Sequence, residues 1–236
     1  MNARAAALLR MTWHDCAFAH WRADGELLAR SLPDGAVLDR FAGEAWLSVV
    51  PFRMTGIRPT FGPVLPGFSA VAEINLRTYV RVGGEPGVWF FSLDAASPLL
   101  VEAARITTGL PYFRARIDTA EHARRIRYAS VRTDNRGPAG RFRAQYDVPR
   151  GAQPAEPETL SAFLHERYRF FTLRGRRLSG GAITHAPWLL GELHIDIMEN
   201  TLGDQIAHPL TRQPDCAFFA RIAQVRAAPL RLAGRS

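Results

Sequence analysis

The sequence predicts an α+β protein that is mainly β, with one domain over residues 1–236, an antiparallel barrel-like sheet and two or three short helices. Three observations support this fold class. A chain of 236 residues with 47% hydrophobic side chains can bury one large core. Its 19 glycines and 16 prolines favour many short elements joined by turns. Residues 71–82 alternate polar and apolar side chains, which is typical of a strand.

The first elements alternate between strands and a helix. Aromatic residues predict a strand over residues 12–22, and Asp24 is placed to cap a short helix after it. Residues 36–41 and 44–55 flank an Ala-Gly pair at 42–43, which predicts a hairpin.

Residues 56–68 predict a long irregular loop, and such loops in compact domains are often lids over functional sites. The alternating strand 71–82 comes next, and a Gly-Gly turn leads into a partner strand at 88–93. Ser97 before a proline is a typical helix start, and Gly109 before Pro111 is a typical stop, so residues 98–108 form a helix.

The second half continues the β-rich pattern. Apolar residues at helical spacing predict a helix over residues 159–168, and four prolines and glycines make residues 149–158 a surface crossing. The expected strands lie near 112–118, 126–132, 141–148, 177–186, 192–199 and 217–225.

Lysine is absent from the chain: all 30 basic residues are arginine. This absence excludes a Schiff-base lysine, a pyridoxal-phosphate lysine and a phosphate-loop lysine. Arginine cannot replace lysine in these roles, because its guanidinium stays protonated near neutral pH. No other cofactor is indicated by the sequence.

The net charge of +8 raises the question of a nucleic-acid partner. Residues 1–118 carry 12 arginines and 11 acidic residues, whereas residues 119–236 carry 18 arginines and 11 acidic residues. The excess arginines cluster between Arg124 and Arg143. Because no nucleic-acid-binding motif accompanies them, the pattern favours a solvated hairpin face over a nucleic-acid interface.

The two cysteines, Cys16 and Cys216, lie two hundred residues apart, and no zinc-binding spacing is present. We therefore expect reduced thiols and no metal site. Residues 1–10 do not have the pattern of a signal peptide, and the longest uncharged stretch, 59–72, contains three prolines and is no membrane span. The sequence predicts a cytoplasmic protein without a membrane partner, and a homo-oligomer is compatible with it.

The best candidate cluster lies on the strand 71–82, where Glu73, Asn75 and Arg77 share one face. Inside a barrel, Arg77 would hold a substrate carboxylate and a desolvated Glu73 would act as general acid or base. The alternative is a solvent face that carries a cross-strand ion pair. The aromatic residues Trp89 and Phe113 are candidates for an apolar pocket or for the ordinary core.

Seven segments together resemble the YqjF-like family of bacterial proteins, a family without an established activity. They are TWHDCAFAHW (12–21), WLSVVPFRMTGIRP (46–59), EINLRTYV (73–80), GVWFFSLDA (87–95), LPYFRAR (110–116), FLHERYRFF (163–171) and HAPW (185–188). The resemblance extends over about residues 12–226. That family is similar in turn to the acetoacetate decarboxylase-like superfamily, which implies a cone-shaped β-barrel with a mostly apolar internal cavity.

The resemblance also implies roles for particular residues. Glu73 matches the superfamily's strand glutamate, and a substrate-facing arginine of the superfamily aligns near His14. The superfamily's reactive lysine lies in a Gly-Phe-Pro-Lys-Lys segment after a helix. Residues 109–113, GLPYF, resemble this segment with Tyr112 and Phe113 in place of both lysines. The resemblance therefore implies the cavity without the imine chemistry.

Two functions remain open at this point. The first is an enzyme for a small carbonyl or carboxylic acid, a lysine-independent lyase, hydratase or isomerase with Glu73 and Tyr112 as catalytic groups. Its substrate-binding residues would be Arg77, Asn75, His14, Phe113 and Trp89. The second is a non-catalytic module that binds a small-molecule ligand in the same cavity; a basic nucleic-acid-binding protein is less favoured. The sequence alone does not decide whether the chain is an enzyme.

Overall fold

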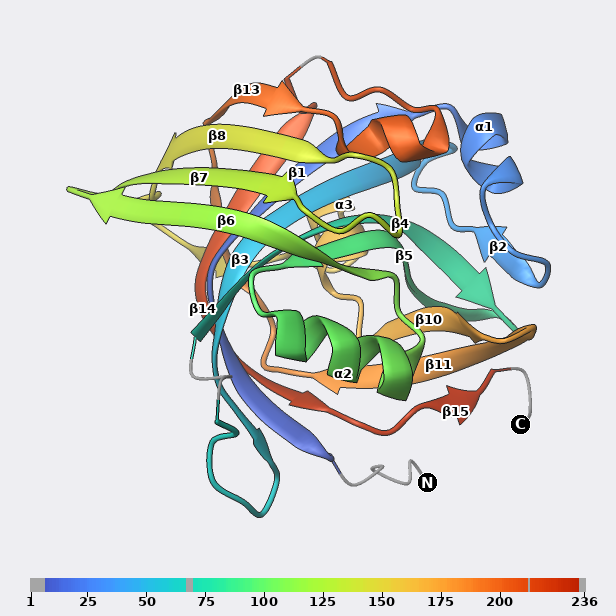
Figure 1. The fold of residues 1–236 in the computed structure, drawn as a ribbon. Helices are drawn as coiled ribbons and strands as arrows, with labels where there is room; N and C mark the ends of the chain where they lie inside the picture. The colour runs from blue at the N-terminus through green and yellow to red at the C-terminus, as the bar shows by residue number, and fades with distance from the viewer. Residues whose placement is uncertain (1–6, 67–69, 212, 234–236) are drawn as a thin grey trace.

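The computed structural model describes residues 7–66, 70–211 and 213–233 (Figure 1). Within these residues fifteen strands form one large sheet. The strands are β1 (Leu9–Ala23), β2 (Ala36–Leu38), β3 (Ala45–Pro59), β4 (Ala70–Val82), β5 (Glu85–Ala95), β6 (Tyr112–His122), β7 (Arg125–Arg132), β8 (Arg141–Asp147), β9 (Gln153–Pro154), β10 (Arg169–Arg174), β11 (Arg177–Thr184), β12 (Leu189–Glu192), β13 (Ile195–Asn200), β14 (Cys216–Ala227) and β15 (Arg231–Leu232).

Part of the sheet closes on itself. Strands β4, β5, β10, β11, β14, β1 and β3 pair in this order, and β3 pairs again with β4. Strands β6, β7, β8 and β13 extend from β5 as a curved layer on one side of the ring (Figure 1). The predicted mainly β, barrel-like fold class is confirmed. The sheet is mixed rather than wholly antiparallel, because β5 pairs in parallel with both β6 and β10.

Three α-helices occur in the described part of the chain: α1 (Gly25–Arg30), α2 (Pro98–Thr108) and α3 (Leu160–His165). The Asp24 carboxylate caps α1 as expected by accepting two backbone N–H groups. Ser97 caps α2, which lies across one end of the ring (Figure 1). The helix predicted over 159–168 is shorter, because the chain turns into β10 at Arg169.

Several predicted strand boundaries need correction. The hairpin expected between 36–41 and 44–55 reduces to one bridge between Phe41 and Glu44, and β2 pairs with β4 instead. Both edges of β3 are already occupied by β1 and β4. The loop predicted over 56–68 begins later, because β3 continues to Pro59; residues 67–68 of that prediction lie outside the described residues.

Further along the chain, the single strand expected over 192–199 is two strands. β12 pairs with β14, and β13 pairs with β8. β10, which follows α3 directly, was not predicted. The two cysteines are free, and the register pairs Cys16 with Ala220 and Cys216 with His20. Four residues of strand separate them, about 13 Å, which is too far for a disulfide.

Gly109 ends α2 in the left-handed conformation, with φ of 71°. A Cβ atom at this position would lie 2.7 Å from the backbone oxygen of Leu173. We therefore expect Gly109→Ala to lower the free energy of unfolding by about 1–3 kcal/mol, measured by urea denaturation. Gly151→Ala is the control, because a Cβ atom there meets nothing within 4 Å; an equal loss in both variants would contradict this explanation.

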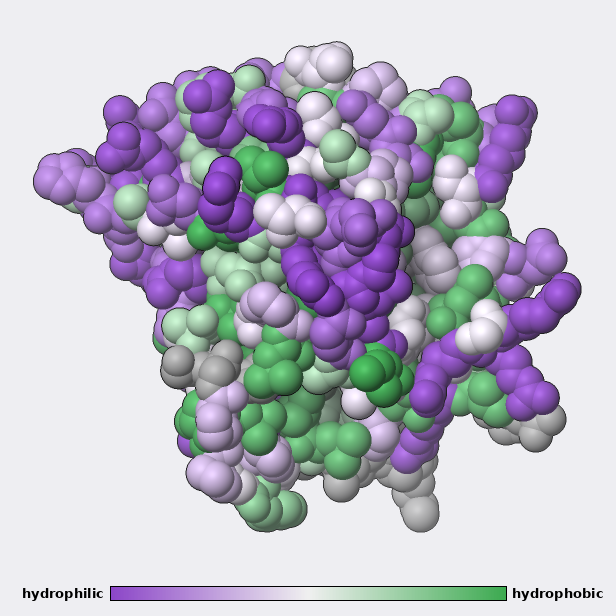
Figure 2. Space-filling view, viewed as in Figure 1, coloured by the Kyte–Doolittle hydropathy of each residue, from purple (hydrophilic) through white to green (hydrophobic). Residues whose placement is uncertain are grey.

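Hydrophobic side chains gather on the surface beside α2 and toward the loop that follows β3 (Figure 2). Leu99 and Ile106 of α2 are exposed there, as is Phe61 of the loop. No helix in the described residues is long and apolar enough to cross a membrane.

Candidate functional site

The ring of strands encloses a cavity of about 330 Å³, which α2 covers at one end. One face of α2 contributes residues at helical spacing, i, i+3, i+4, i+7 and i+8. They are Leu100, Ala103, Ala104, Thr107 and Thr108. Most of the remaining wall is aliphatic or aromatic and includes Trp13, Phe52 and Met54. The cavity is therefore an apolar chamber that one amphipathic helix covers at one end.

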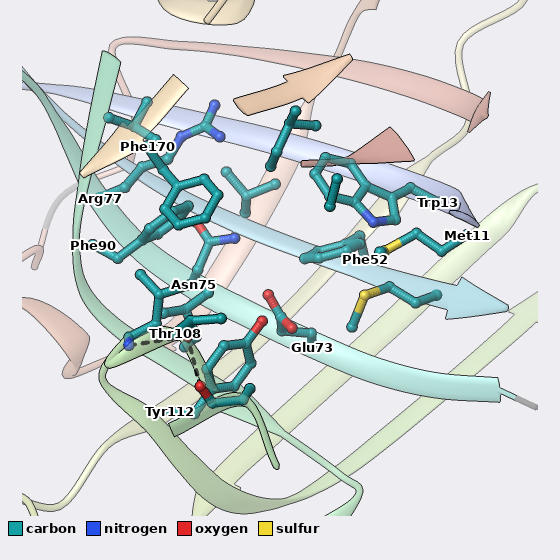
Figure 3. Close-up of a pocket in the computed structure, with 18 of the residues that line it drawn as sticks. Met11, Trp13, Phe52, Glu73, Asn75, Arg77, Phe90, Thr108, Tyr112 and Phe170 are labelled. Atoms are coloured by element: carbon teal, nitrogen blue, oxygen red, sulfur yellow. Dashed lines mark hydrogen bonds between the residues drawn. The ribbon is translucent and has the colours of Figure 1, made fainter. Parts of the chain in front are cut away.

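A strip of polar side chains crosses this apolar wall along β4. Glu73, Asn75 and Arg77 all line the cavity, in that order along the strand (Figure 3). On the opposite face of β4, Ile74 and Leu76 are fully buried in the core formed with β7 and β8. Both faces of the strand are thus covered, so the alternative of a solvent-exposed ion-pair face does not apply.

Glu73 is 2% exposed, and its Oε2 atom has no hydrogen-bond partner within the described residues. Burial raises the pKa of Glu73 to about 8, and the charge of Asp94 adds to this rise. Hydrogen bonding with Tyr112 and Asn75 acts in the opposite direction on this pKa. A carboxyl group with a pKa near neutrality can both take up and release a proton at physiological pH.

Tyr112 begins β6, and its hydroxyl points toward the Glu73 carboxyl (Figure 3). The turn at Gly109 and Pro111 brings it there, and Arg105 of α2 donates a 2.7 Å hydrogen bond to its backbone oxygen. Burial and the neighbouring Glu73 raise the pKa of Tyr112 well above 10, so the hydroxyl keeps its proton. Glu73 and Tyr112 form a coupled acid and hydrogen-bond donor at the cavity wall.

Arg77 lies at the other end of the polar strip. Its Nη2 donates a 3.5 Å hydrogen bond to the backbone oxygen of Leu164, and its guanidinium lies over the ring of Phe18. Its Nε atom is buried without a hydrogen-bond partner, as is the Oδ1 atom of Asn75, among the described residues. Both groups are therefore available to a bound molecule.

A chain of buried hydrogen bonds links Tyr79, Ser48, His20 and His165. His165 Nδ1 donates to the Ser161 oxygen at 2.7 Å, so its Nε2 accepts the proton of His20 Nε2 at 3.2 Å. His20 Nδ1 accepts from the Ser48 hydroxyl at 2.7 Å, and Ser48 accepts from Tyr79 at 2.7 Å. The chain runs in one direction, from Tyr79 to the Ser161 oxygen.

Both histidines of this chain are neutral. Burial, together with the nearby Arg77, lowers the pKa of His165 to about 3. Burial also lowers the pKa of His20, with additional contributions from His165 and Arg77. His165 lines the cavity, which the sequence analysis did not anticipate. Two histidines 145 residues apart give no local pattern, so the sequence held no usable signal for the pair.

Three of the predicted ligand-binding residues do not line the cavity. His14 lies outside it and is hydrogen-bonded to Thr55 at 2.8 Å between Nε2 and Oγ1. Trp89 packs on the outer face of β5, while its neighbours Val88 and Phe90 line the cavity. Phe113 points away from the cavity, and the guanidinium of Arg132 lies 4.2 Å above its ring. Strand alternation accounts for the last two placements.

The arginine cluster between 124 and 143 is partly neutralised. Arg132 is buried in an ion pair with Asp94, and Arg136 pairs with Glu102 and Asp134. On the sheet surface Arg125 pairs with Asp147. The described residues hold no group of three or more histidine, cysteine or acidic side chains that would suit a metal ion.

The buried carboxyl of Glu73 makes stability depend on pH. Its pKa is 4.5 when unfolded and about 8 when folded, so the protonated form favours the folded state. The contribution is complete below pH 4.5 and is lost as the pH rises toward 8. We expect Glu73→Gln to gain stability relative to the native chain by up to about 1.4 kcal/mol per pH unit in this window. Urea denaturation across the window measures the difference, and a constant difference would contradict it.

The sequence and the fold both match known proteins. Residues 10–224 match the family model DUF2071, described as an uncharacterized conserved protein. The uncharacterized protein YqjF of Bacillus subtilis (strain 168) is 38% identical over 224 residues, which are 95% of this chain and 92% of that protein.

Solved structures share the fold at low identity. The enduracididine biosynthesis enzyme MppR, solved with a condensation product of pyruvate and imidazole 4-carboxaldehyde, matches with a TM-score of 0.66 and 15% identity, over 95% of this chain and 88% of its own. Acetoacetate decarboxylase from Legionella pneumophila matches with a TM-score of 0.63 and 14% identity, over 99% and 91%. An acetoacetate decarboxylase-like enzyme from Sphingomonas wittichii RW1 matches with a TM-score of 0.64 and 15% identity, over 96% and 94%. The chain therefore belongs to the DUF2071 family and has the acetoacetate decarboxylase-like fold.

Proposed function

We propose that this chain binds a small carbonyl or carboxylic acid in its cavity and moves a proton on it through Glu73. The reaction would be that of a lyase, hydratase or isomerase. It involves no lysine imine, because the chain has no lysine. The observation that carries the proposal is the buried Glu73, which lines an apolar cavity and has a pKa of about 8, with one oxygen that has no hydrogen-bond partner among the described residues.

The proton transfer uses groups that are already in place. The ionised Glu73 takes a proton from the carbon next to the ligand's carbonyl group, and the C–H electron pair moves onto the carbonyl oxygen as an enolate. Tyr112 donates a hydrogen bond to this oxygen, where negative charge develops. Reversal returns a proton from Glu73 to carbon. Arg77 supplies the counter-charge for a ligand carboxylate.

A small carbonyl acid is also the ligand of one solved protein with this fold. The similar enzyme MppR was solved with pyruvate, a small oxo acid, with a TM-score of 0.65. Identity of 14% limits this likeness to the fold, so the argument for this chain rests on its own Glu73, Tyr112 and Arg77.

The test is carbon–hydrogen exchange in D₂O, followed by NMR with 4-oxopentanoate, 5-oxohexanoate and hexan-2-one as probes. The expected result is incorporation of deuterium next to the carbonyl group that depends on Glu73. The rate should rise with pH and level off above about pH 8, where Glu73 is ionised. Saturable binding of these probes without exchange would instead support the non-catalytic ligand-binding module.

A further inference from the structure

The charged side chains that line the cavity restrict which ligands it can bind. Three arginines line the cavity: Arg77, Arg167 and Arg169. Arg167 is paired with Asp39 at 2.7 Å and Arg169 with Glu85 at 2.7 Å. For Arg77, the described residues provide no carboxylate partner within ion-pair distance. A ligand anion would therefore pair with Arg77 rather than with the other two.

The histidines near Arg77 add no positive charge to this part of the cavity wall. His165 and His20 are held neutral by the directional hydrogen-bond chain described above. His185, which also lines the cavity, donates a 2.7 Å hydrogen bond from Nδ1 to the Ala186 oxygen, and burial lowers its pKa. Among the cavity-lining groups of the described residues, Arg77 is thus the positive charge without a carboxylate partner.

Glu73, the proposed proton-transfer group, lies well away from the Arg77 guanidinium. Glu73 and Arg77 are four residues apart on one strand, so their Cα atoms are separated by about 13 Å. Figure 3 shows Asn75 between them, and Phe52 of β3 lies directly opposite Glu73 in the strand register. Tyr112, Asp94 and Asn75 are the side chains that shift the pKa of Glu73. Arg77 lowers the pKa of His165, and Arg77 and Glu73 both act on the pKa of Cys16, which also lines the cavity.

The cavity volume sets the ligand size. At roughly 30 Å³ for each water-sized atom, about 330 Å³ corresponds to about 11 non-hydrogen atoms. An acid with its carbonyl next to the carboxylate cannot reach Glu73 while its carboxylate contacts Arg77, because these side chains project in parallel from one strand face. A chain of several methylene groups can make both contacts and also fill the apolar space.

We propose that the cavity takes an amphipathic carboxylic acid of about 11 non-hydrogen atoms, whose carboxylate pairs with Arg77 and whose carbonyl or hydroxyl group, at least four bonds along the chain, contacts Glu73 and Tyr112. This inference rests on the proposed function of the same cavity and names its ligand class. The ligand is elongated, with polar groups toward both ends of the Glu73–Arg77 strip and an apolar body between them.

Two isomeric acids provide the test. 2-Oxooctanoate and 7-oxooctanoate have the same atoms but place the carbonyl group at opposite ends of the chain. Binding is measured by calorimetry on the full chain and by fluorescence of Trp13 and Trp188, which both line the cavity. We expect 7-oxooctanoate to bind about tenfold more tightly, and Tyr112→Phe to remove most of this difference. Equal affinities, or tighter binding of the 2-oxo isomer, would overturn the inference.

The Arg77 contact is tested with octanoate and octan-1-ol. Arg77→Met should weaken octanoate binding by about 30-fold and change octan-1-ol binding by less than about threefold. Arg125→Met removes the same charge on the sheet surface and should leave both affinities unchanged. Octanoate binding that is unaffected by Arg77→Met, or absence of saturable binding of all three acids at millimolar concentration, would overturn the inference.

The results separate this inference from the proposed function. If 2-oxooctanoate is preferred while Glu73-dependent exchange persists on the short probes, the ligand class is wrong and the proton-transfer function stands. If the predicted order of affinities holds without any exchange, the ligand class stands and the catalytic proposal is wrong.

Discussion

Glu73→Gln is expected to slow deuterium exchange next to the ligand carbonyl by at least about 100-fold, because an amide cannot accept the proton. Glutamine preserves the volume of the side chain, so the cavity and its closure by α2 are retained. The pH dependence of the residual rate should also disappear, since Glu73 is the group whose pKa lies at about 8. NMR of the oxo acid in D₂O measures both effects.

Two further variants show whether this loss is specific. Tyr112→Phe removes the donor to the forming enolate oxygen and should slow exchange by about tenfold, less than the loss of Glu73. His14→Gln serves as the control, because His14 contacts Thr55 outside the cavity. Exchange at the native rate in the Glu73→Gln variant, or an equal loss in the His14→Gln variant, would contradict the assignment of Glu73 as the base.

Asp94→Ala is expected to lower the free energy of unfolding by about 3–5 kcal/mol. The Asp94 and Arg132 side chains are each 1% exposed, and Arg132 Nη2 lies 2.9 Å from Asp94 Oδ1. Removal of the carboxylate leaves a buried guanidinium without its counter-charge. Urea denaturation measures the change.

The double variant Asp94→Ala/Arg132→Met tests whether the unpaired charge of Arg132 causes the loss of stability in Asp94→Ala. Because both charges are then absent, it should regain more than half of the stability lost in the single variant. Asp147→Ala, which breaks the exposed pair with Arg125, is the surface control and should leave the denaturation midpoint unchanged. A double variant as unstable as Asp94→Ala alone would show that packing, rather than charge, dominates here.

The strand 71–82 shows which features of the candidate site a sequence pattern can predict and which it cannot. Period-two alternation placed Glu73, Asn75 and Arg77 on one face, and the structure places all three on the cavity wall. The same alternation is typical of a sheet with one wet face, so it could not reveal that both faces of β4 are covered. Closure of the ring depends on the pairing of β4 with β5 and of β5 with β10, and the second of these is a long-range contact.

Local irregularities limited the prediction of the remaining site residues. Asp15 has a φ of 55°, and β1 has a register shift against β3 between His14 and Ala19. Met11 and Trp13 line the cavity before this irregularity, and Cys16 and Phe18 line it afterwards. A uniform period of two cannot describe such a strand. The turn after α2 was predictable from its glycine and proline, and it leads directly to the tyrosine on the cavity wall.

The one-way hydrogen-bond chain of Tyr79, Ser48, His20 and His165 makes these four positions unequal in their tolerance of change. Loss of the Tyr79 hydroxyl removes one donor to Ser48 and leaves every later link intact. Loss of the Ser48 hydroxyl removes the 2.7 Å donor to the buried His20 Nδ1 and leaves that nitrogen only the weaker contact with the Tyr79 hydroxyl, at 3.4 Å. We therefore expect the loss of the Tyr79 hydroxyl to disturb this buried chain less than the loss of the Ser48 hydroxyl.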